Sequence, residues 1–277
     1  MNYRHHYHAG NFADVLKHAV LALLVANLTR KPKGFAVIDT HGGAGIYDLL
    51  QGPSQKTLEW RDGIGRVLAA RDGAPPALLP YFQAMQGDKG RYPGSPLLAG
   101  RLMRAQDRLY VCELHPEDAA LLKAAMAGEA ALLPRVQVVA GDGYRNLLRQ
   151  VPPQERRGLV LIDPPFEAAD EFERLAQAVI AAHRAWAQGC YLLWYPVKDG
   201  AAAAAFEAEI QTHGIADILR VRLRVRGGGE GLCETGLIII NPVYPLEDQL
   251  RAVLPWLSSV LAQGEGAGFD LLRLAAE

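Results

Sequence analysis

Alternation between strand-like and helical segments constrains the fold of this chain more than any other feature of the sequence. Apolar runs of strand length recur at Phe35–Asp39, Leu109–Glu113, Val136–Ala140, Leu159–Asp163 and Tyr191–Tyr195. Amphipathic helical patterns lie between them, which predicts a parallel sheet covered by helices on both faces. The chain has 277 residues, of which 50% are hydrophobic, enough to bury one large core. We therefore expect one α/β domain over residues 1–277.

Two features depart from simple alternation. The runs Ile218–Arg226 and Leu237–Asn241 are joined by the glycine-rich segment Gly227–Gly231, which predicts an antiparallel hairpin. The acids that end the first two strands, Asp39 and Glu113, lie 74 residues apart, whereas a simple βαβ unit places its second-strand acid about 20 residues after the glycine loop. Helical patterns in this interval predict a small helical insertion at about residues 52–92, made either of structural helices or of a substrate-gripping element.

The fourth strand-like run ends abruptly in Asp163, Pro164, Pro165 and Phe166. Because proline cannot continue a central strand, the strand must stop and present Asp163 at its carboxyl end. That edge of an open α/β sheet is where ligands bind. The Asp163 carboxylate and the Pro164 carbonyl accept N–H bonds, and the Phe166 ring can stack. The motif suits a flat ring that carries an exocyclic amine, although a proline turn with a packed phenylalanine is the plainer alternative.

A glycine loop and two acids follow the earlier strands. The loop Asp39–Gly45 follows the first strand, and its glycines allow the backbone to approach a ligand closely. Glu113 ends the second strand, where an acid can accept bonds from both ribose hydroxyls. Asp142 follows the third strand, where a short carboxylate can accept an adenine amine. Each acid could instead cap a helix or form a turn, but their joint placement at strand ends predicts a nucleoside-cofactor enzyme.

Composition limits the possible partners and locations. The formal net charge is -1, so no overall positive field attracts nucleic acid and any polyanion must meet a local patch. The three cysteines are widely spaced and odd in number, which argues against a disulfide framework and fits a reducing cytosol. The apolar run Ala19–Ala26 is far shorter than the roughly 20 residues of a membrane span. We expect a cytoplasmic protein without a membrane segment.

The order of these motifs resembles that of class I amino-methyltransferases, whose signature is Asp or Asn, then Pro-Pro and an aromatic residue. Further segments resemble the bacterial RlmJ family, which methylates adenine N6 in 23S ribosomal RNA. These segments are Tyr3–His5, His8–Asn11, Ala13–His18, Asp39–His41, Tyr92–Pro96, Cys112–Pro116 and Leu193–Pro196. The resemblance covers nearly the whole chain. Gly43 in place of an alanine and Phe166 in place of a tyrosine are minor departures.

The resemblance implies a Rossmann-like class I methyltransferase fold, with a seven-stranded, mostly parallel sheet and an antiparallel final strand. It also implies S-adenosylmethionine as the cofactor. The residues that it places at the cofactor pocket are His18, His41, Ser95, Glu113, Asp142, Gly143 and Asp163, to which the glycine loop adds Gly43 and Gly45. It places Tyr3 near the RNA. Taken alone, His18 could be a core histidine and Ser95 the N-cap of a helix that has proline in its first turn.

The predicted catalytic residues are Asp163, Pro164 and Phe166. Bonds from a target amine to the Asp163 and Pro164 oxygens favour a more tetrahedral nitrogen, and Asp163 is the best candidate proton acceptor. Methylation of a protein glutamine amide or of DNA adenine is the alternative, although the glutamine enzymes usually have Asn at the position of Asp163. Cytosine-C5 methylation requires a cysteine nucleophile, and all three cysteines look structural.

The expected partner is 23S ribosomal RNA or an assembly intermediate, bound by a monomer with the target base flipped or unstacked onto Phe166. Arginines alternate with apolar residues along the sixth strand, so they line one face and could grip phosphates. They are Arg220, Arg222, Arg224 and Arg226. Arg30–Lys33 and Arg156–Arg157 are further candidates. We expect no metal, because the nearby histidines His5, His6 and His8 have no carboxylate or cysteine partner at ligand spacing.

Overall fold

An eight-stranded sheet forms the centre of the structure, a computed structural model that describes residues 5–87 and 90–275. The strand order is β10-β8-β9-β7-β6-β1-β4-β5. The strands are β1 Ala36–Asp39, β4 Arg108–Glu113, β5 Val136–Ala140, β6 Gly158–Ile162, β7 Cys190–Pro196, β8 Ile218–Arg224, β9 Glu234–Ile240 and β10 Gly268–Ala275. The strands β5, β4, β1, β6 and β7 pair in parallel, whereas β9 is antiparallel to both β7 and β8. The parallel sheet and the β8–β9 hairpin confirm the predicted class I methyltransferase fold.

The predicted count of seven strands is wrong by one. β10 adds an edge strand antiparallel to β8, with Phe269 opposite Leu223 and Asp270 opposite Arg222. Along β10, intermediate and exposed residues do not alternate regularly. An edge strand with one neighbour is not required to bury a whole face. The sequence of β10 therefore lacks the apolar pattern that marked the central strands.

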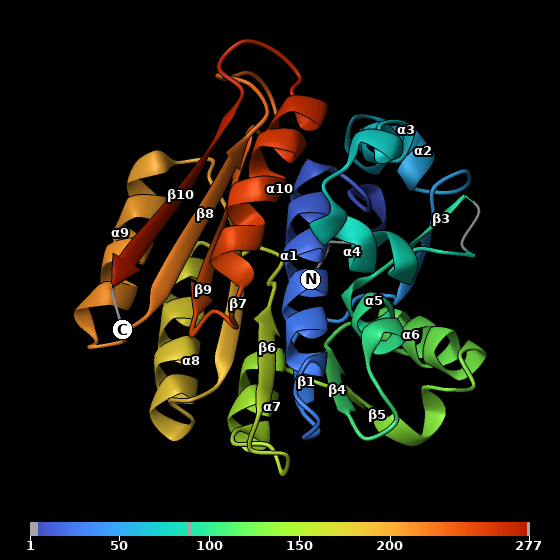
Figure 1. Ribbon diagram of the computed structural model, residues 1–277, viewed down its shortest axis with the longest axis vertical. Coiled ribbons are helices and arrows are strands. Elements are labelled where there is room, and N and C mark those ends of the chain that lie inside the picture. The colour runs from blue at the N-terminus through green and yellow to red at the C-terminus, as the bar shows by residue number, and fades with distance from the viewer. Residues whose placement is uncertain (1–4, 88–89, 276–277) are drawn as a thin grey trace.

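Helices cover both faces of the sheet and form two separate apolar cores (Figure 1). One core lies under α1 Phe12–Thr29, α5 Ser95–Leu102, α6 Pro116–Gly128 and α10 Leu246–Leu261. The other lies under α7 Gly143–Gln150, α8 Glu171–Ala185 and α9 Gly200–Thr212. Short 3-10 turns lie at His5–Tyr7 and Leu133–Arg135. A three-layer arrangement of this kind leaves the ends of the parallel strands accessible between the helices.

Helix α1 begins where the sequence predicts. The Asn11 side chain accepts hydrogen bonds from the backbone N–H groups of Ala13 and Asp14, both at 3.0 Å, which caps the helix. By length and composition alone α1 could cross a membrane, but 89% of it is buried inside the fold, as in the core helix of a globular domain. Its burial places Asp14, Lys17 and His18 inside the protein.

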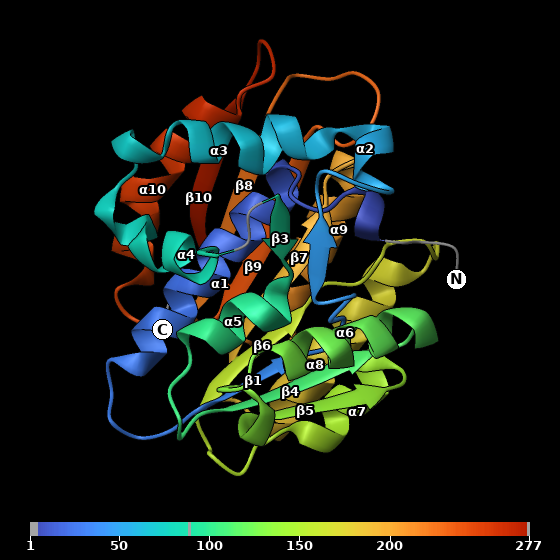
Figure 2. The ribbon, with the colours of Figure 1, turned by 90° about the vertical axis from the view of Figure 1, so that its right-hand side faces the viewer.

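The predicted helical insertion at about residues 52–92 is made of short helices. The strands β2 Ile46–Asp48 and β3 Arg91–Pro93 pair antiparallel and bracket the segment. Between them lie α2 Ser54–Thr57, η2 Arg61–Gly65, α3 Arg66–Ala69, η3 Arg71–Gly73, η4 Pro76–Leu78 and α4 Leu79–Ala84. Ile64, Val67 and Tyr81 are buried in the same core as α1 and α10. The inserted helices therefore extend the main core and cover one end of α1 (Figure 2).

Candidate active site

The carboxyl ends of β1, β4, β6 and β7 surround a cavity of about 680 Å³ beside the first turns of α1. This volume lies within the range of roughly 300–1,000 Å³ that small-molecule sites occupy. The predicted site residues that line it are His18, His41, Gly43, Ser95, Glu113, Asp163, Pro164 and Phe166. Residues from strands that are far apart in the sequence are thus brought together around one space.

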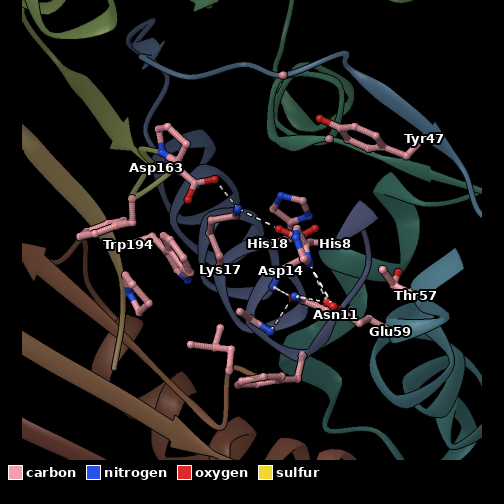
Figure 3. A pocket seen from close by; sticks show the side chains of 18 of the residues that line it. His8, Asn11, Asp14, Lys17, His18, Tyr47, Thr57, Glu59, Asp163 and Trp194 are labelled. Carbon is pink, nitrogen blue, oxygen red and sulfur yellow. Dashed lines mark hydrogen bonds and ion pairs between the residues drawn. The ribbon is translucent and has the colours of Figure 1, made fainter. Parts of the chain in front are cut away.

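A buried chain of charges links α1 to the end of β6. The Lys17 ammonium forms ion pairs with Asp163 Oδ2 and, at 2.8 Å, with Asp14 Oδ1 (Figure 3). Asp14 in turn accepts a hydrogen bond from the Gly10 N–H at 2.9 Å. Burial alone would lower the pKa of Lys17, but the two carboxylates raise it above its ordinary value. The ion pair holds one oxygen of Asp163, and no hydrogen bond within the described residues engages its Oδ1.

The Asp-Pro-Pro-Phe segment ends in an unusual backbone conformation. Phe166 has φ 49°, a left-handed conformation that costs a bulky residue on the order of 1–3 kcal/mol. Its ring is held edge-to-face by Phe172 and Trp194, with ring centroids at 4.8 and 5.6 Å. The aromatic contacts thus maintain a strained residue at the cavity wall. Strain of this kind clusters at ligand-binding sites.

Glu113 anchors the glycine loop. Its carboxylate accepts the backbone N–H of Gly43 at 2.7 Å and that of His115 at 2.7 Å. Burial raises the pKa of Glu113 above its usual value, although these hydrogen bonds oppose the shift. A Cβ on Gly42 would lie 2.3 Å from Val111 Cγ1, so only glycine allows the loop to pass this close to β4. Loop and acid together form one preorganised wall.

Two titratable groups at the end of β1 are electrically unusual. Burial lowers the pKa of His41 to about 4, so its imidazole is neutral at pH 7. Burial raises the pKa of Asp39 to about 7, although the Ser95 hydroxyl and the His41 N–H both donate to its carboxylate. Repulsion from Asp163 adds to this rise. His41 is therefore uncharged at pH 7 and Asp39 is partly protonated there, beside the ion-paired Asp163.

Replacing Asp39 with asparagine should change how stability depends on pH. Because the pKa of Asp39 is higher in the folded chain than in the unfolded chain, its contribution to stability is complete below about pH 4 and is lost as the pH rises through 7. Asp39→Asn keeps a hydrogen-bond acceptor but cannot ionise. One pKa unit corresponds to about 1.4 kcal/mol. Between pH 4 and 8, the difference in free energy of unfolding between the variant and wild type should therefore grow in the variant's favour by on the order of 4 kcal/mol. Urea unfolding at each pH measures this, and Asp72→Asn, on an exposed carboxyl, is the control. Parallel pH profiles for Asp39→Asn and wild type would contradict the prediction.

His18 lies in a buried aromatic cluster at the cavity edge. Its Nδ1 lies 2.8 Å from the Tyr92 hydroxyl, and the two rings stack with centroids 5.3 Å apart. The Tyr92 hydroxyl lies 3.0 Å from that of Tyr81 in the inserted helices. His18 is therefore both a satisfied core histidine and a lining residue of the cavity. The two interpretations of the sequence are compatible at this position.

Other predicted residues lie apart from the cavity lining. Asp142 caps α7, because its Oδ1 accepts the Arg145 N–H at 2.9 Å, which is the alternative role considered from the sequence. Gly143 packs against the β1 loop, since a Cβ there would lie 2.2 Å from the Thr40 carbonyl oxygen. Gly45 has φ 81° and turns the glycine loop. Tyr3 lies outside the described residues.

The arginines of the sixth strand, which the sequence predicts to grip phosphates, are paired within the fold, and that prediction is corrected here. Arg220 and Arg222 both bind Glu207 of α9, with N–O distances of 2.9 and 2.7 Å, and Arg220 also pairs with Asp270 of β10. Arg224 donates to the Gly266 carbonyl at 2.7 Å. The alternation does place these side chains on one face, but Glu207 of α9 pairs with Arg220 and Arg222 there. Arg220, Arg222 and Arg224 therefore join β8 to its neighbours and do not form a free basic surface.

Three residues at the cavity received no role from the sequence. Lys17 binds Asp163, Trp194 supports the Phe166 ring, and His115 follows the strand that Glu113 ends. Trp194 Nε1 and His115 Nδ1 are buried and have no hydrogen-bond partner within the described residues. The spacing of Asp14 and Lys17 on one helix face was the only sequence signal for the ion pair. Unpartnered buried nitrogens at a cavity wall are positions that a ligand can satisfy.

The histidines near the beginning of the chain bind carboxylates separately. His6 Nε2 lies 3.3 Å from Asp118, and His8 Nδ1 lies 3.0 Å from Glu59. Within residues 5–87 and 90–275, no group of three or more His, Cys, Asp or Glu side chains is arranged to hold a metal ion. The first pair connects the 3-10 turn to α6, and the second connects the segment before α1 to the inserted helices.

Comparisons with known proteins point to one family. A family model described as "Ribosomal RNA large subunit methyltransferase D, RlmJ" matches residues 32–270. Proteins named "Ribosomal RNA large subunit methyltransferase J" from Haemophilus influenzae and Escherichia coli are each 38% identical, over 97% and 94% of this chain and 96% and 94% of their own lengths. The crystal structure of protein LPL1258 from Legionella pneumophila is similar with a TM-score of 0.89 and 34% identity, covering 96% of this chain and 98% of that one.

Proposed function

Because the chain belongs to the RlmJ family of ribosomal RNA large subunit methyltransferases, we propose that it methylates the exocyclic N6 amine of an adenine in 23S ribosomal RNA. Methylation of ribosomal RNA with S-adenosylmethionine as cofactor follows from the family; the target atom and the roles of the residues are the proposal. The observation that carries it is the Asp163–Phe166 segment at the end of β6, which puts a carboxylate, a proline and an aromatic ring on one cavity.

The residues fit the cofactor. The cavity wall contains the fixed carboxylate of Glu113 and a glycine loop in which Gly42 has no room for a Cβ. It also contains two ring nitrogens without a partner among the described residues, those of Trp194 and His115. We propose that His18, His41, Gly43, Ser95, Glu113 and Asp163 hold S-adenosylmethionine, with Gly45, Asp142 and Gly143 shaping the adjoining loops. Bound there, the cofactor supplies an electrophilic methyl group on a sulfonium. A neutral His41 adds no positive charge beside that cation.

The chain's own groups prepare the target amine. Asp163 Oδ1 and the Pro164 carbonyl oxygen accept its two N–H bonds, which localises the nitrogen lone pair toward the methyl donor. Lys17 fixes the other Asp163 oxygen and so sets the direction of the carboxylate. The new N–C bond would form as the bond between the methyl carbon and the sulfonium sulfur breaks, leaving a neutral thioether; the nitrogen would lose a proton, and Asp163 is placed to accept it. Holding the reacting groups in line supplies much of the remaining rate enhancement.

Shortening Phe166 should weaken binding of the target nucleotide. A base stacked on an aromatic side chain gains about 1–3 kcal/mol, so Phe166→Ala should raise KM for RNA roughly 5- to 150-fold while cofactor affinity stays unchanged. Phe166→Tyr keeps the ring and is the matched variant, with KM close to wild type. Steady-state methyl transfer at varied RNA concentration measures this. An equal KM for Phe166→Ala and wild type would remove the stacking role.

Transfer of labelled methyl groups tests the proposed target directly. The protein is incubated with tritiated S-adenosylmethionine and unmodified 23S ribosomal RNA transcript, with DNA and protein substrates in parallel, and the labelled nucleosides are identified. Label in N6-methyladenosine of the RNA is expected. Label at another RNA position, in DNA adenine or in a protein glutamine would overturn the N6 assignment. We propose that the enzyme acts in the cytoplasm as a monomer on 23S ribosomal RNA or an assembly intermediate.

A further inference from the structure

A second cavity, here called the basic groove, lies at the opposite end of the sheet from Asp163. It has a volume of about 590 Å³ and lies between the end of α1 and the first residue of β6. These elements meet at the lower end of α1 in Figure 1. Five of its lining residues are cations and none is an acid. The cations are Arg30, Lys31, Lys33, Arg156 and Arg157.

The backbone that carries these cations is held in place. The Arg104 guanidinium donates to the carbonyls of Lys31 and Lys33, at 2.8 and 3.1 Å. The Arg157 guanidinium donates to the carbonyls of Leu28 and Lys33, at 2.7 and 3.2 Å. Both guanidiniums also lie over the Phe35 ring. The loop is thus fixed through its main chain, which leaves the Lys31 and Lys33 side chains exposed to solvent.

No acid within the described residues neutralises the exposed cations. The buried Asp107 carboxylate binds Arg104 at 3.0 Å, Asp217 pairs with Arg273, and Glu155, which precedes Arg156, forms no ion pair with the described residues. Arg30, Lys31, Lys33 and Arg156 are exposed and form no ion pair with the described residues. Like charges that are held close together repel, so this cluster of cations does not stabilise the fold. The net charge of the chain is -1, so a local cluster of exposed cations indicates an anionic partner.

The lining of the catalytic cavity carries more acids than cations, so an RNA needs a basic surface elsewhere on the protein. Seven Asp and Glu residues line the catalytic cavity, against four Lys and Arg residues. Its lining therefore does not favour a polyanion, although a large RNA must bring its target base there. Phosphate contacts supply a large share of the affinity in protein–nucleic-acid binding. That affinity must come from outside the cavity.

We propose that the basic groove binds the phosphate backbone of the same RNA molecule, away from the target nucleotide. This inference rests on the proposed function. The five residues of β6 separate the groove from Asp163 by about 17 Å, a distance that a folded RNA segment spans. Tyr244 borders the groove with 79% of its surface exposed, which suits stacking on an unpaired base. The recognised element is therefore a phosphate backbone next to an unstacked nucleotide.

The test compares two triple variants that each remove three exposed cations. The groove variant is Lys31→Gln/Lys33→Gln/Arg156→Gln, which spares the arginines that hold the loop. The control is Lys123→Gln/Arg149→Gln/Arg184→Gln on the exposed surfaces of α6, α7 and α8. Binding to 23S ribosomal RNA transcript is measured between 50 and 300 mM KCl. Three lost phosphate contacts should reduce the slope of log affinity against log salt by about 2–3.

For the groove variant we expect a Kd raised roughly 10- to 100-fold at 150 mM KCl, with kcat at saturating RNA unchanged. The control triple should bind like wild type. Equal slopes and Kd values for the two triples would overturn the proposal. A loss seen only with ribosomal particles, and absent with protein-free RNA, would assign the groove to a ribosomal protein and also overturn it. Failure of wild type to methylate RNA would refute the proposed function instead, while the difference in Kd would still report on the groove.

Discussion

Asp163→Ala should lower kcat for methyl transfer by about 10²–10⁴-fold, the contribution typical of a positioned general base. Asp163 is the group that we propose orients the amine and accepts its proton, with one oxygen held by Lys17 and the other facing no partner among the described residues. Alanine removes both functions. The alanine variant also leaves Lys17 with Asp14 as its carboxylate partner, so the buried charge stays paired. Single-turnover transfer to RNA from labelled S-adenosylmethionine measures the effect.

Two controls separate loss of chemistry from loss of the fold or of the cofactor. The affinity of Asp163→Ala for S-adenosylmethionine, measured by calorimetry, should fall much less than kcat. Asp163→Asn keeps an oxygen that accepts a bond from the amine but is a far weaker base, so its kcat should lie between those of alanine and wild type. A rate for Asp163→Ala within threefold of wild type would exclude Asp163 as the proton acceptor.

The central sheet could be predicted because its sequence signal is local. The central strands β1 and β6 are apolar runs that are buried along their whole length, and an acid ends the first and follows the second at the edge where ligands bind. For the same reason Glu113 and Asp163 could be placed at one edge before any contact was known. Proline fixed the end of β6 in the same way, since neither Pro164 nor Pro165 can donate to a ladder.

The features that could not be predicted depend on contacts between distant segments. The spacing of the arginines in β8 correctly indicated a shared face, but nothing in that strand shows that Glu207 of α9 covers it. β10 completes the edge through pairing with β8 and not through its own pattern. Lys17 and Asp163 are 146 residues apart. Sequence periodicity reports which face a residue lies on, whereas the partner on that face is set by the packing of whole elements.

Lys17→Met should reduce both stability and activity. Removing one member of a buried ion pair leaves the other charges uncompensated and typically costs about 3–5 kcal/mol. Here the loss would leave Asp14 and Asp163 facing each other without the ammonium that lies between them. Urea unfolding at pH 7 measures the destabilisation. Because carboxylates without a counterion are protonated more readily in the folded state, the deficit should shrink as the pH falls toward 4.

A second variant separates the structural role of Lys17 from its positioning role. Asp14→Asn/Lys17→Met removes one negative charge together with the positive one, so it should recover part of the lost free energy of unfolding. Methyl transfer should stay low, because Asp163 still lacks the group that directs its carboxylate. If activity returned together with stability, Lys17 would serve only the fold. If Lys17→Met were as stable as wild type at pH 7, the ion pair would contribute nothing to the fold, and if it were also as active, the ion pair would not orient Asp163.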